Sequence, residues 1–420
     1  MFNLKEEERD YLCKNDCTSF WVTSQSATPS EKIRVVSETN LRLGLNSNVY
    51  SSKNGNLSGS PTVEPQDADY KIPRLIDEVE DLILSRVPRS DYGNVCLVSK
   101  RYLSLLKSGQ LFRIRNENGL AEPSVFVLAN NETSWWTFDR KFKSARKLPI
   151  LPSTDGCFNN GDKESLCAGT HLLVLGRELE GSVIWRYQLA SNRWSKAPSM
   201  INSRCMFASA TCGNFGYIAG GNDTETYREI LNSAEKYNPE SGSWERLPNM
   251  HKKRRASSGC FMDNKFFVIG GNNKEEGNLK CAEAFDVKKN TWEWIPNMLE
   301  NLPVIAAQSP PLVAVVNNQL YYLEHSNNEL MVYLKNTKSW KNLGSVPVRA
   351  DLRRGWGVAF KSLGNELLVI GASTNSNASH SMTVYSCSPD PDATQLHWNP
   401  LQCGLNELNH FIKNCSVMIL

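Results

Sequence analysis

Three arginines recur at nearly the same point of a repeating pattern. Arg204, Arg254 and Arg354 each lie 16 or 17 residues before a glycine that follows an apolar run (220 − 204, 270 − 254 and 371 − 354). Guanidinium groups that gather at one place bind carboxylates or phosphates through paired hydrogen bonds. If the repeats put these arginines at equivalent positions, they face one rim and form a target-binding site. The other interpretation, arginines that bond to loop carbonyls, remains open.

The histidines do not form a catalytic or metal-binding pattern. They are spread along the chain without the spacing of a metal-ligand motif, at His171, His251, His325, His380, His397 and His410. The sequence also contains no phosphate-binding glycine loop and no serine nucleophile elbow. We therefore predict a protein that is not an enzyme, uses no cofactor and carries no metal.

One short stretch, His251-Lys252-Lys253-Arg254-Arg255, is strongly basic. Such a run can act as a nuclear import signal or contact nucleic acid. It lies between the last strand of one predicted repeat and the first strand of the next. The favoured interpretation is therefore a solvated loop.

A repeating set of short β-strands must position these residues. The clearest copy runs from Gly259 to Met298 and has four segments rich in β-forming residues, each bounded by Gly, Asn or Pro. Its second segment ends at Gly270-Gly271, where the backbone must turn sharply or approach other backbone closely. One sheet of this size cannot bury both faces by itself, so further copies are expected.

Copies of this pattern recur with a period near 50 residues. Gly220 precedes Gly270 by 50 residues (270 − 220), and Trp244 precedes Trp292 by 48 (292 − 244). Four strands, a pair of glycines and a late tryptophan at this period resemble the kelch repeat, whose copies are the blades of a β-propeller. The resemblance implies that both tryptophans are buried between adjacent blades.

The resemblance predicts a mainly β fold with six blades over residues 124–420. A segment at 124–149 supplies the later strands of a blade without a first strand, and 409–420 resembles a first strand with nothing after it. We therefore predict a propeller closed by pairing of its N- and C-terminal strands, which removes exposed sheet edges. The five internal repeats are expected at about 157–200, 203–250, 253–298, 310–347 and 354–402.

Residues 71–119 have a different pattern, typical of a small module of three helices. Apolar side chains recur at helical spacing from Leu75 to Val87, and Pro88 ends this helix. A second helix is predicted from Asp91 through Leu106, followed by a third near 110–118. Three short helices have a thin core, so the module needs a neighbour to be stable.

Within this module, the segments 75–79, 83–88 and 97–102 resemble an F-box. That motif docks a protein onto a Skp-type adaptor and, through it, onto a cullin scaffold. From about residue 70 to the C-terminus, the chain is similar to plant F-box/kelch-repeat proteins. A helical cap that only packs against the propeller is the alternative. The resemblance implies an adaptor-binding face made of Leu75, Ile76, Val79, Ile83, Val87, Pro88, Val98 and Tyr102.

Composition limits the remaining possibilities. Residues 1–70 are rich in Ser, Asn, Gly, Thr and Pro, which predicts a disordered tail. A net charge of +3 over 420 residues gives no bulk attraction for nucleic acid or membranes, and no apolar run approaches the roughly 20 residues that span a membrane. Twelve scattered cysteines and an acidic N-terminus predict reduced thiols in the nucleus or cytoplasm.

These features predict a substrate-recognition subunit of a cullin-based ubiquitin ligase. In this interpretation the F-box docks the Skp-type adaptor and the propeller binds a target protein. The alternative is a non-catalytic kelch interaction scaffold without ligase recruitment. A copper oxidase on a kelch propeller is the enzymatic alternative, and it requires converging Tyr, His and Cys ligands. The identity of the target cannot be predicted, because loops determine it.

Overall fold

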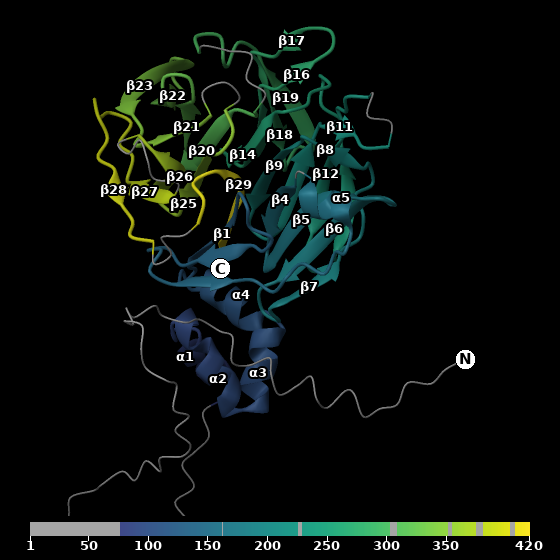
Figure 1. The fold of residues 1–420 in the computed structure, drawn as a ribbon, viewed down its shortest axis with the longest axis vertical. Coiled ribbons are helices and arrows are strands. Elements are labelled where there is room, and N and C mark those ends of the chain that lie inside the picture. Colours follow the sequence, from purple (N-terminus) through teal and green to yellow (C-terminus); the bar gives the residue numbers. More distant parts are fainter. Residues whose placement is uncertain are drawn as a thin grey trace, which may run out of the picture. The chain divides into compact units, whose positions relative to one another are not determined.

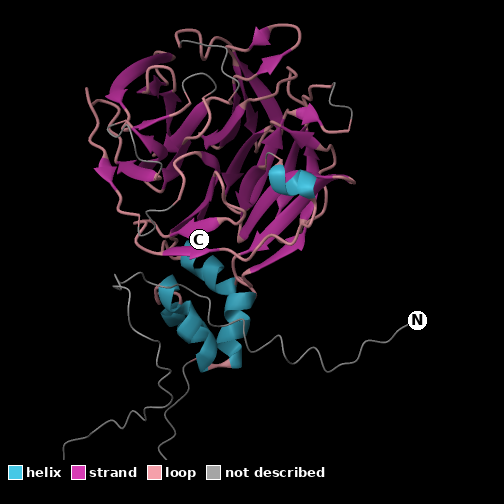
Figure 2. Ribbon diagram, viewed as in Figure 1, coloured by secondary structure: helices cyan, strands magenta, loops and turns pink. Residues whose placement is uncertain are grey.

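The computed structural model describes residues 76–420, apart from 162, 226–228, 303–308, 352–354, 375–380 and 404–407. The prediction of a disordered tail over residues 1–70 lies outside the described residues. Helices occupy the first described part of the chain and antiparallel strands most of the rest (Figure 1, Figure 2). The described residues belong to two compact units, one that ends at Glu80 and one that begins at Asp81. Residues 76–80 are therefore described by themselves.

The helical module contains four α-helices within the described residues, one more than predicted. The second predicted helix is two helices, because Ser99 has an extended backbone (φ −154°, ψ 156°) between them. The Ser99 side chain accepts a hydrogen bond from the Tyr102 amide and so caps the later helix. The elements are α1 (Asp77–Leu84), the 3-10 helix η2 (Arg89–Asp91), α2 (Tyr92–Val98), α3 (Lys100–Lys107) and α4 (Gln110–Glu117).

The strands form six antiparallel blades. Blade 1 is β29 (Ile412–Ile419), β1 (Pro123–Ala129), β2 (Trp136–Phe138) and β3 (Ala145–Lys147). Blade 2 is β4 (Glu164–Ala168), β5 (His171–Glu178), β6 (Gly181–Gln188) and β7 (Arg193–Lys196), preceded by the short helix α5 (Gly156–Asn160). Blade 3 is β9 (Ala208–Cys212), β10 (Phe215–Ala219), β12 (Ala234–Asn238) and β13 (Ser243–Leu247), with the pair β8 (Arg204–Cys205) and β11 (Asn222–Asp223) at its end.

The other three blades repeat this order. Blade 4 is β14 (Ser258–Met262), β15 (Lys265–Ile269), β18 (Ala282–Asp286) and β19 (Thr291–Ile295), with the pair β16 (Asn272–Asn273) and β17 (Gly277–Asn278). Blade 5 is β20 (Leu312–Val316), β21 (Gln319–Glu324), β22 (Glu329–Leu334) and β23 (Ser339–Ser345). Blade 6 is β25 (Ala359–Leu363), β26 (Glu366–Ser373), β27 (Thr383–Cys387) and β28 (Asn399–Pro400), with β24 (Val348–Arg349) paired to β26.

The ring closes as predicted, through the two ends of the propeller. β1 pairs antiparallel with β29, from Pro123 opposite Ile419 to Ala129 opposite Ile412. The first strands of the blades contact one another in a closed ring, in the order β29, β4, β9, β14, β20, β25 and back to β29. Both partial segments identified in the sequence therefore belong to one composite blade.

Glycines allow the close backbone contacts that the sequence predicts. Gly270 and Gly271 both have positive φ (63° and 83°), as the backbone leaves β15. A Cβ atom on Gly259 would lie 2.5 Å from the carbonyl oxygen of Ser209, where β14 approaches β9 of the neighbouring blade. Only a residue without a side chain fits at these positions.

The repeated tryptophans connect successive blades. In each case the indole N–H donates a hydrogen bond to a carbonyl that follows the last strand of the preceding blade. Trp292 is buried between its blades as predicted, whereas Trp244 is only half-buried there. The bonds are Trp194 to Pro149 (2.8 Å), Trp244 to Pro198 (3.1 Å), Trp292 to Pro248 (2.7 Å) and Trp340 to Met298 (2.7 Å).

Candidate functional site

Arg204 is positioned by β8 and reaches into the interior of blade 3. Its Nη1 donates hydrogen bonds to the carbonyls of Gly220 (3.0 Å) and Ser233 (2.7 Å), and its Nη2 donates to Glu235 Oε1 (2.5 Å). Neither side chain of the Arg204–Glu235 pair has any exposed surface. Burial lowers the pKa of the Arg204 guanidinium, and the Glu235 carboxylate opposes this shift.

Arg254 repeats this geometry in blade 4. Its Nη1 donates to the carbonyls of Gly270 (3.0 Å) and Cys281 (3.3 Å), and its Nη2 donates to Glu283 Oε1 (2.8 Å). The Arg254–Glu283 pair is likewise fully buried. The shared register of the two arginines therefore reflects one structural device, a buried ion pair that ties an incoming loop to its blade.

The prediction that these arginines present cations to a target does not agree with the geometry. Arg204 and Arg254 sit at equivalent points, as their spacing indicates, but each guanidinium is turned inward onto carbonyls and a glutamate. In this conformation neither side chain can contact a bound protein. Arg354, the third member of the predicted site, lies outside the described residues.

The basic run at 251–255 is neutralised by neighbouring side chains. Each of its five residues has an acidic or amide partner, so the run is not a free string of positive charge. This agrees with the interpretation as an ordinary loop. The partners are Glu283 for His251 and Arg254, Glu276 for Lys252, Glu229 for Lys253 and Asn272 for Arg255.

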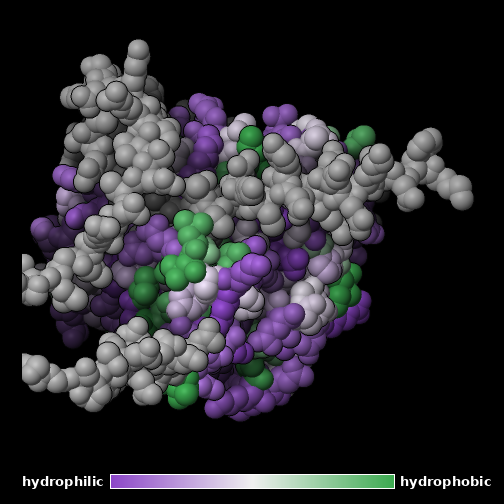
Figure 3. Space-filling model, turned by 90° about the horizontal axis from the view of Figure 1, so that it is seen from below, coloured by the Kyte–Doolittle hydropathy of each residue, from purple (hydrophilic) through white to green (hydrophobic). Residues whose placement is uncertain are grey.

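The helical module carries an unusually exposed set of apolar side chains. We call Leu82 and Ile83 of α1 with Leu97 and Val98 of α2 the apolar helix surface. Ile83 is 51% exposed, Leu97 67% and Val98 70%. Figure 3 views the end of the molecule that carries these helices in Figure 1, and hydrophobic side chains gather on that face. Exposed apolar side chains that gather on one face mark interaction surfaces.

The other predicted adaptor-binding residues divide into three groups. Ile76 and Val79, at the start of α1, and Pro88 are exposed. Val87 and Tyr102 are half-buried and pack against the core cluster at the base of the module. Leu75 lies outside the described residues. Leu82 and Leu97 were not predicted as site residues, although Leu82 continues the helical spacing of α1 and Leu97 directly precedes Val98.

Polar bonds inside the module hold α1 against the later helices. Arg101 donates to Asp81 Oδ1 at 2.6 Å, and Gln110 donates to Asp81 Oδ2 at 3.4 Å. Asp81 is 7% exposed, so this carboxylate links three helices from the interior. The apolar helix surface is therefore displayed on a fixed frame.

Two buried arginines join the module to the start of the propeller. Arg115 donates to the carbonyl of Ser85 (2.7 Å) and forms an ion pair with Glu122 (3.1 Å). Arg89 donates to the other oxygen of Glu122 (3.1 Å) and to the carbonyl of Pro123 (3.1 Å), the first residue of β1. Burial lowers the pKa of Arg89, and Glu122 opposes this shift.

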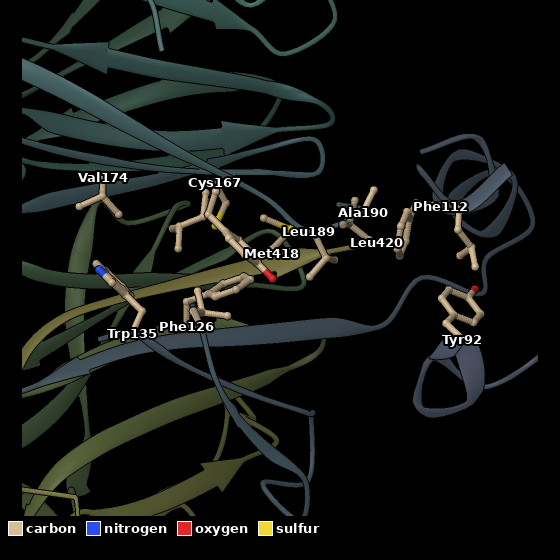
Figure 4. Packing of buried hydrophobic residues seen from close by; sticks show 14 of the residues in the cluster. Tyr92, Phe112, Phe126, Trp135, Cys167, Val174, Leu189, Ala190, Met418 and Leu420 are labelled. Atoms are coloured by element: carbon tan, nitrogen blue, oxygen red, sulfur yellow. The ribbon is translucent and has the colours of Figure 1, made fainter. Parts of the chain in front are cut away.

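An apolar cluster completes this junction. Tyr92 and Phe112 of the module belong to the same cluster as Leu189, Ala190 and Leu420 of the propeller. Figure 4 shows Phe112 beside Leu420 and Ala190, with Met418, Phe126 and Trp135 continuing the cluster into the blades. The thin core of the helices is thus extended by the propeller, as its small size requires.

Neither a metal-ligand cluster nor a membrane-spanning helix is found among the described residues. Among them, no group of three or more His, Cys, Asp or Glu side chains could hold a metal ion. No helix of the described chain has the length and apolar character needed to cross a bilayer.

Comparison with known proteins agrees with both parts of the fold. The Kelch motif family matches residues 203–251 and 253–299, which contain blades 3 and 4. The chain is 47% identical to F-box/kelch-repeat protein At3g27150 of Arabidopsis thaliana, over 86% of this chain and 87% of that protein. It is 37% identical to F-box/kelch-repeat protein At1g26930 of the same plant, over 88% of each chain. F-box/kelch-repeat protein SKIP11 of Arabidopsis thaliana is 39% identical, over 80% of this chain and 72% of that protein. The helices before a six-bladed propeller and this extent of identity show that the chain belongs to the F-box/kelch-repeat protein family.

Proposed function

We propose that this protein is a substrate-recognition subunit of a cullin-based ubiquitin ligase. The helical module binds a Skp-type adaptor, and the propeller holds the target protein. In this role the chain makes and breaks no bond itself. It raises the effective concentration of target lysines near the charged ubiquitin-conjugating enzyme.

The observation that carries this proposal is the apolar helix surface. Leu84, Leu105 and Leu106 of the same module are buried, whereas Ile83, Leu97 and Val98 face outward. Fully burying such a side chain contributes about 1.5–3 kcal/mol, and these three, which are 51% to 70% exposed, forgo part of it. A protein partner that covers them recovers this free energy, and apolar residues at the centre of an interface dominate its affinity.

The junction with the propeller supports the same role. Arg89 and Arg115 both bind Glu122, and their remaining bonds fix the backbone on either side of it. A linker held in this way keeps the propeller at a set distance from a bound adaptor. Such a fixed distance suits a protein that presents lysines to a second enzyme.

Co-purification with a Skp-type adaptor tests the proposal. The double variant Ile83→Glu/Val98→Glu places two charges on the apolar helix surface and should abolish adaptor binding. Leu179→Glu changes an equally exposed leucine, 80% exposed on blade 2, and is the matched control that should bind normally. Val87 is unsuitable for this test, because it packs against the core cluster.

Adaptor binding that survives in the double variant would refute the proposed docking surface. If instead the wild-type chain itself fails to bind a Skp-type adaptor, the interaction-scaffold alternative replaces the ligase role. The ten described cysteines are free thiols, which fits the reducing nucleus or cytoplasm in which we propose that the protein acts.

A further inference from the structure

A small pocket lies between blades 4 and 5. It has a volume of about 60 Å³ and is lined by residues that follow β15 and β19 on one side and β21 on the other. Five hydrogen-bonding side chains line it, and the three most buried of them are Ser309, Tyr322 and His325. They are 8%, 8% and 7% exposed, respectively, so all three are more than nine-tenths buried.

None of these three side chains forms a hydrogen bond or an ion pair within the described chain. Their polar atoms do not belong to the fully buried atoms that lack a hydrogen-bond partner in the described chain. They are therefore accessible to solvent in the pocket. Water in the pocket can therefore bond to these groups, and a ligand that displaces it must offer hydrogen bonds in its place. Three such groups around one pocket give a polar ligand several hydrogen bonds at once.

Gly355 shows how closely these groups converge. A Cβ atom on Gly355 would overlap Ser309 Oγ and lie 3.3 Å from His325 Cδ2. The hydroxyl and the imidazole ring therefore lie close to the same point of the backbone. Since one water occupies roughly 10–15 Å³ of such a volume, about 60 Å³ holds a group of a few heavy atoms.

The lining favours a hydrogen-bond acceptor. Burial, with a smaller contribution from the Glu324 carboxylate, raises the pKa of Tyr322 to about 12, so its phenol is a donor at neutral pH. Asn272 accepts a hydrogen bond from Arg255 at 2.8 Å through Oδ1, which leaves its amide N–H₂ as a further donor. Among the residues that the structure describes, no aspartate or glutamate lines the pocket.

The neighbouring acidic group is already occupied. The Glu324 carboxylate accepts hydrogen bonds from the Ser326 hydroxyl (2.7 Å) and from the amide of Asn327 (2.7 Å). It therefore turns back on its own loop and does not compete for the donors of the pocket.

We propose that this pocket receives the carboxylate of an aspartate or glutamate side chain presented by a target protein. Ser309, Tyr322 and His325 supply the hydrogen bonds, and the surrounding leucines and prolines exclude water. The proposal rests on the proposed function, in which the propeller holds the target, and it adds the chemical class of one recognised residue.

The position of the pocket suits this role. The helical module approaches the turn between β4 and β5, where Gly109 lies against Thr170. The pocket opens instead among the connections that follow second and fourth strands, beside β16 and β17. Figure 1 shows β16 and β17 at the opposite end of the propeller from α2 and α3. A target bound there leaves the apolar helix surface free for the adaptor.

Histidine-selective NMR of the full chain tests the pocket directly. The His325 signal is identified by its loss in His325→Gln, and blocked aspartate (N-acetyl-aspartyl-N-methylamide) is titrated as the probe. We expect a saturable shift of the His325 signal and none of the buried His171 signal in blade 2. Ser309→Ala and Tyr322→Phe should each raise the dissociation constant about tenfold, the loss expected for one hydrogen bond to a charged group.

Tyr321→Phe is the matched control. Tyr321 lies on the same strand, is 1% exposed and packs into a different core cluster, so its variant should bind the probe like the wild type. A His325 signal that never moves would overturn the proposal. So would an equal response to blocked asparagine, or tighter binding of inorganic phosphate.

Adaptor co-purification separates this inference from the proposed function. If the Ser309→Ala/Tyr322→Phe chain and the wild type both bind the adaptor but neither binds aspartate, only the pocket proposal fails. If the wild type binds aspartate but no adaptor, only the ligase role fails.

Discussion

The apolar helix surface and the interiors of blades 3 and 4 differ in which side chains they expose and which they bury. Ile83 and Val98 are apolar yet stand in solvent, whereas Arg204 and Arg254 are charged yet have no exposed surface. In the module, exposure of an apolar group has no structural benefit within the described chain, and we therefore propose a partner there. In the blades, burial of a charge is fully compensated inside the protein and indicates a structural role.

The difference shows what a repeated pattern can and cannot indicate. The spacing of Arg204 and Arg254 correctly predicts that they occupy equivalent positions in successive blades, and such positions have the same surroundings. It cannot give the direction in which the side chain points. Each arginine has a glutamate on the third strand of its own blade, Glu235 or Glu283, and that partner decides its burial.

The largest effect is expected from removing the strand that closes the ring. Deletion of residues 409–420 removes β29, which leaves β1 and β4 without their neighbour. It also removes Leu420 from the cluster beneath the helices. We expect loss of cooperative thermal unfolding and rapid proteolysis of both the propeller and the module. A truncated chain that unfolds like the wild type would show that this closure is dispensable.

The next effect concerns the buried charges. Arg254→Ala leaves the Glu283 carboxylate buried without its cation, which should lower the free energy of unfolding by about 3–5 kcal/mol. Lys253→Ala, one residue away, removes an exposed partner of Glu229 and should cost less than about 1 kcal/mol. Urea unfolding of both variants measures the contrast. Similar losses in the two variants would contradict the structural role of Arg254.

Much of the fold could be predicted from the sequence, because its signals are local and repeated. The glycine pairs and tryptophans mark the blades, and the two incomplete segments at 124–149 and 409–420 predict each other. The break at Ser99 was missed, because the apolar spacing continues across it from Val95 to Tyr102. Capping by the Ser99 side chain outweighs that spacing.

The sites were harder to predict than the fold. Of the residues that the F-box resemblance implies, Ile83 and Val98 lie on the apolar helix surface, whereas Val87 and Tyr102 pack against the core cluster. Leu82 and Leu97 of this surface were not predicted. The pocket of Ser309, Tyr322 and His325 could not be predicted, because its members come from different connections and blade 5 lacks the glycine pair that aligns blades 3 and 4. Their shared feature, the absence of a hydrogen-bond partner within the described chain, becomes visible only in three dimensions.

A smaller, pH-dependent effect is expected from the blade interior. Burial, with a contribution from nearby Arg186, lowers the pKa of His171 to about 4, compared with about 6.5 in an unfolded chain. Between these values the unfolded state binds a proton that the folded state does not. Neutral His171 therefore makes its full contribution to the free energy of unfolding above pH 6.5. As the pH falls toward 4 this contribution is lost, which lowers the free energy of unfolding by at most about 3 kcal/mol.

Urea unfolding at pH 7.5 and pH 4.5 measures this effect. Between pH 7.5 and pH 4.5, the free energy of unfolding of His171→Gln should decrease less than that of the wild type. His397→Gln removes an exposed histidine and serves as the matched control, with a decrease close to that of the wild type. An unchanged decrease in His171→Gln would mean that His171 is not buried in its neutral form, which would weaken the contrast between interior and surface.

The smallest effect on stability is expected on the apolar helix surface itself. Leu97 is 67% exposed, so Leu97→Gln removes little buried area and keeps a side chain that favours helices. The free energy of unfolding should change by less than about 0.5 kcal/mol. Leu105→Gln, in which a buried leucine of the next helix is changed, should instead cost about 2–5 kcal/mol by analogy with other losses from a core. A marked loss in Leu97→Gln would mean that this side chain is covered within the chain, and the surface would then belong to the fold and not to a partner.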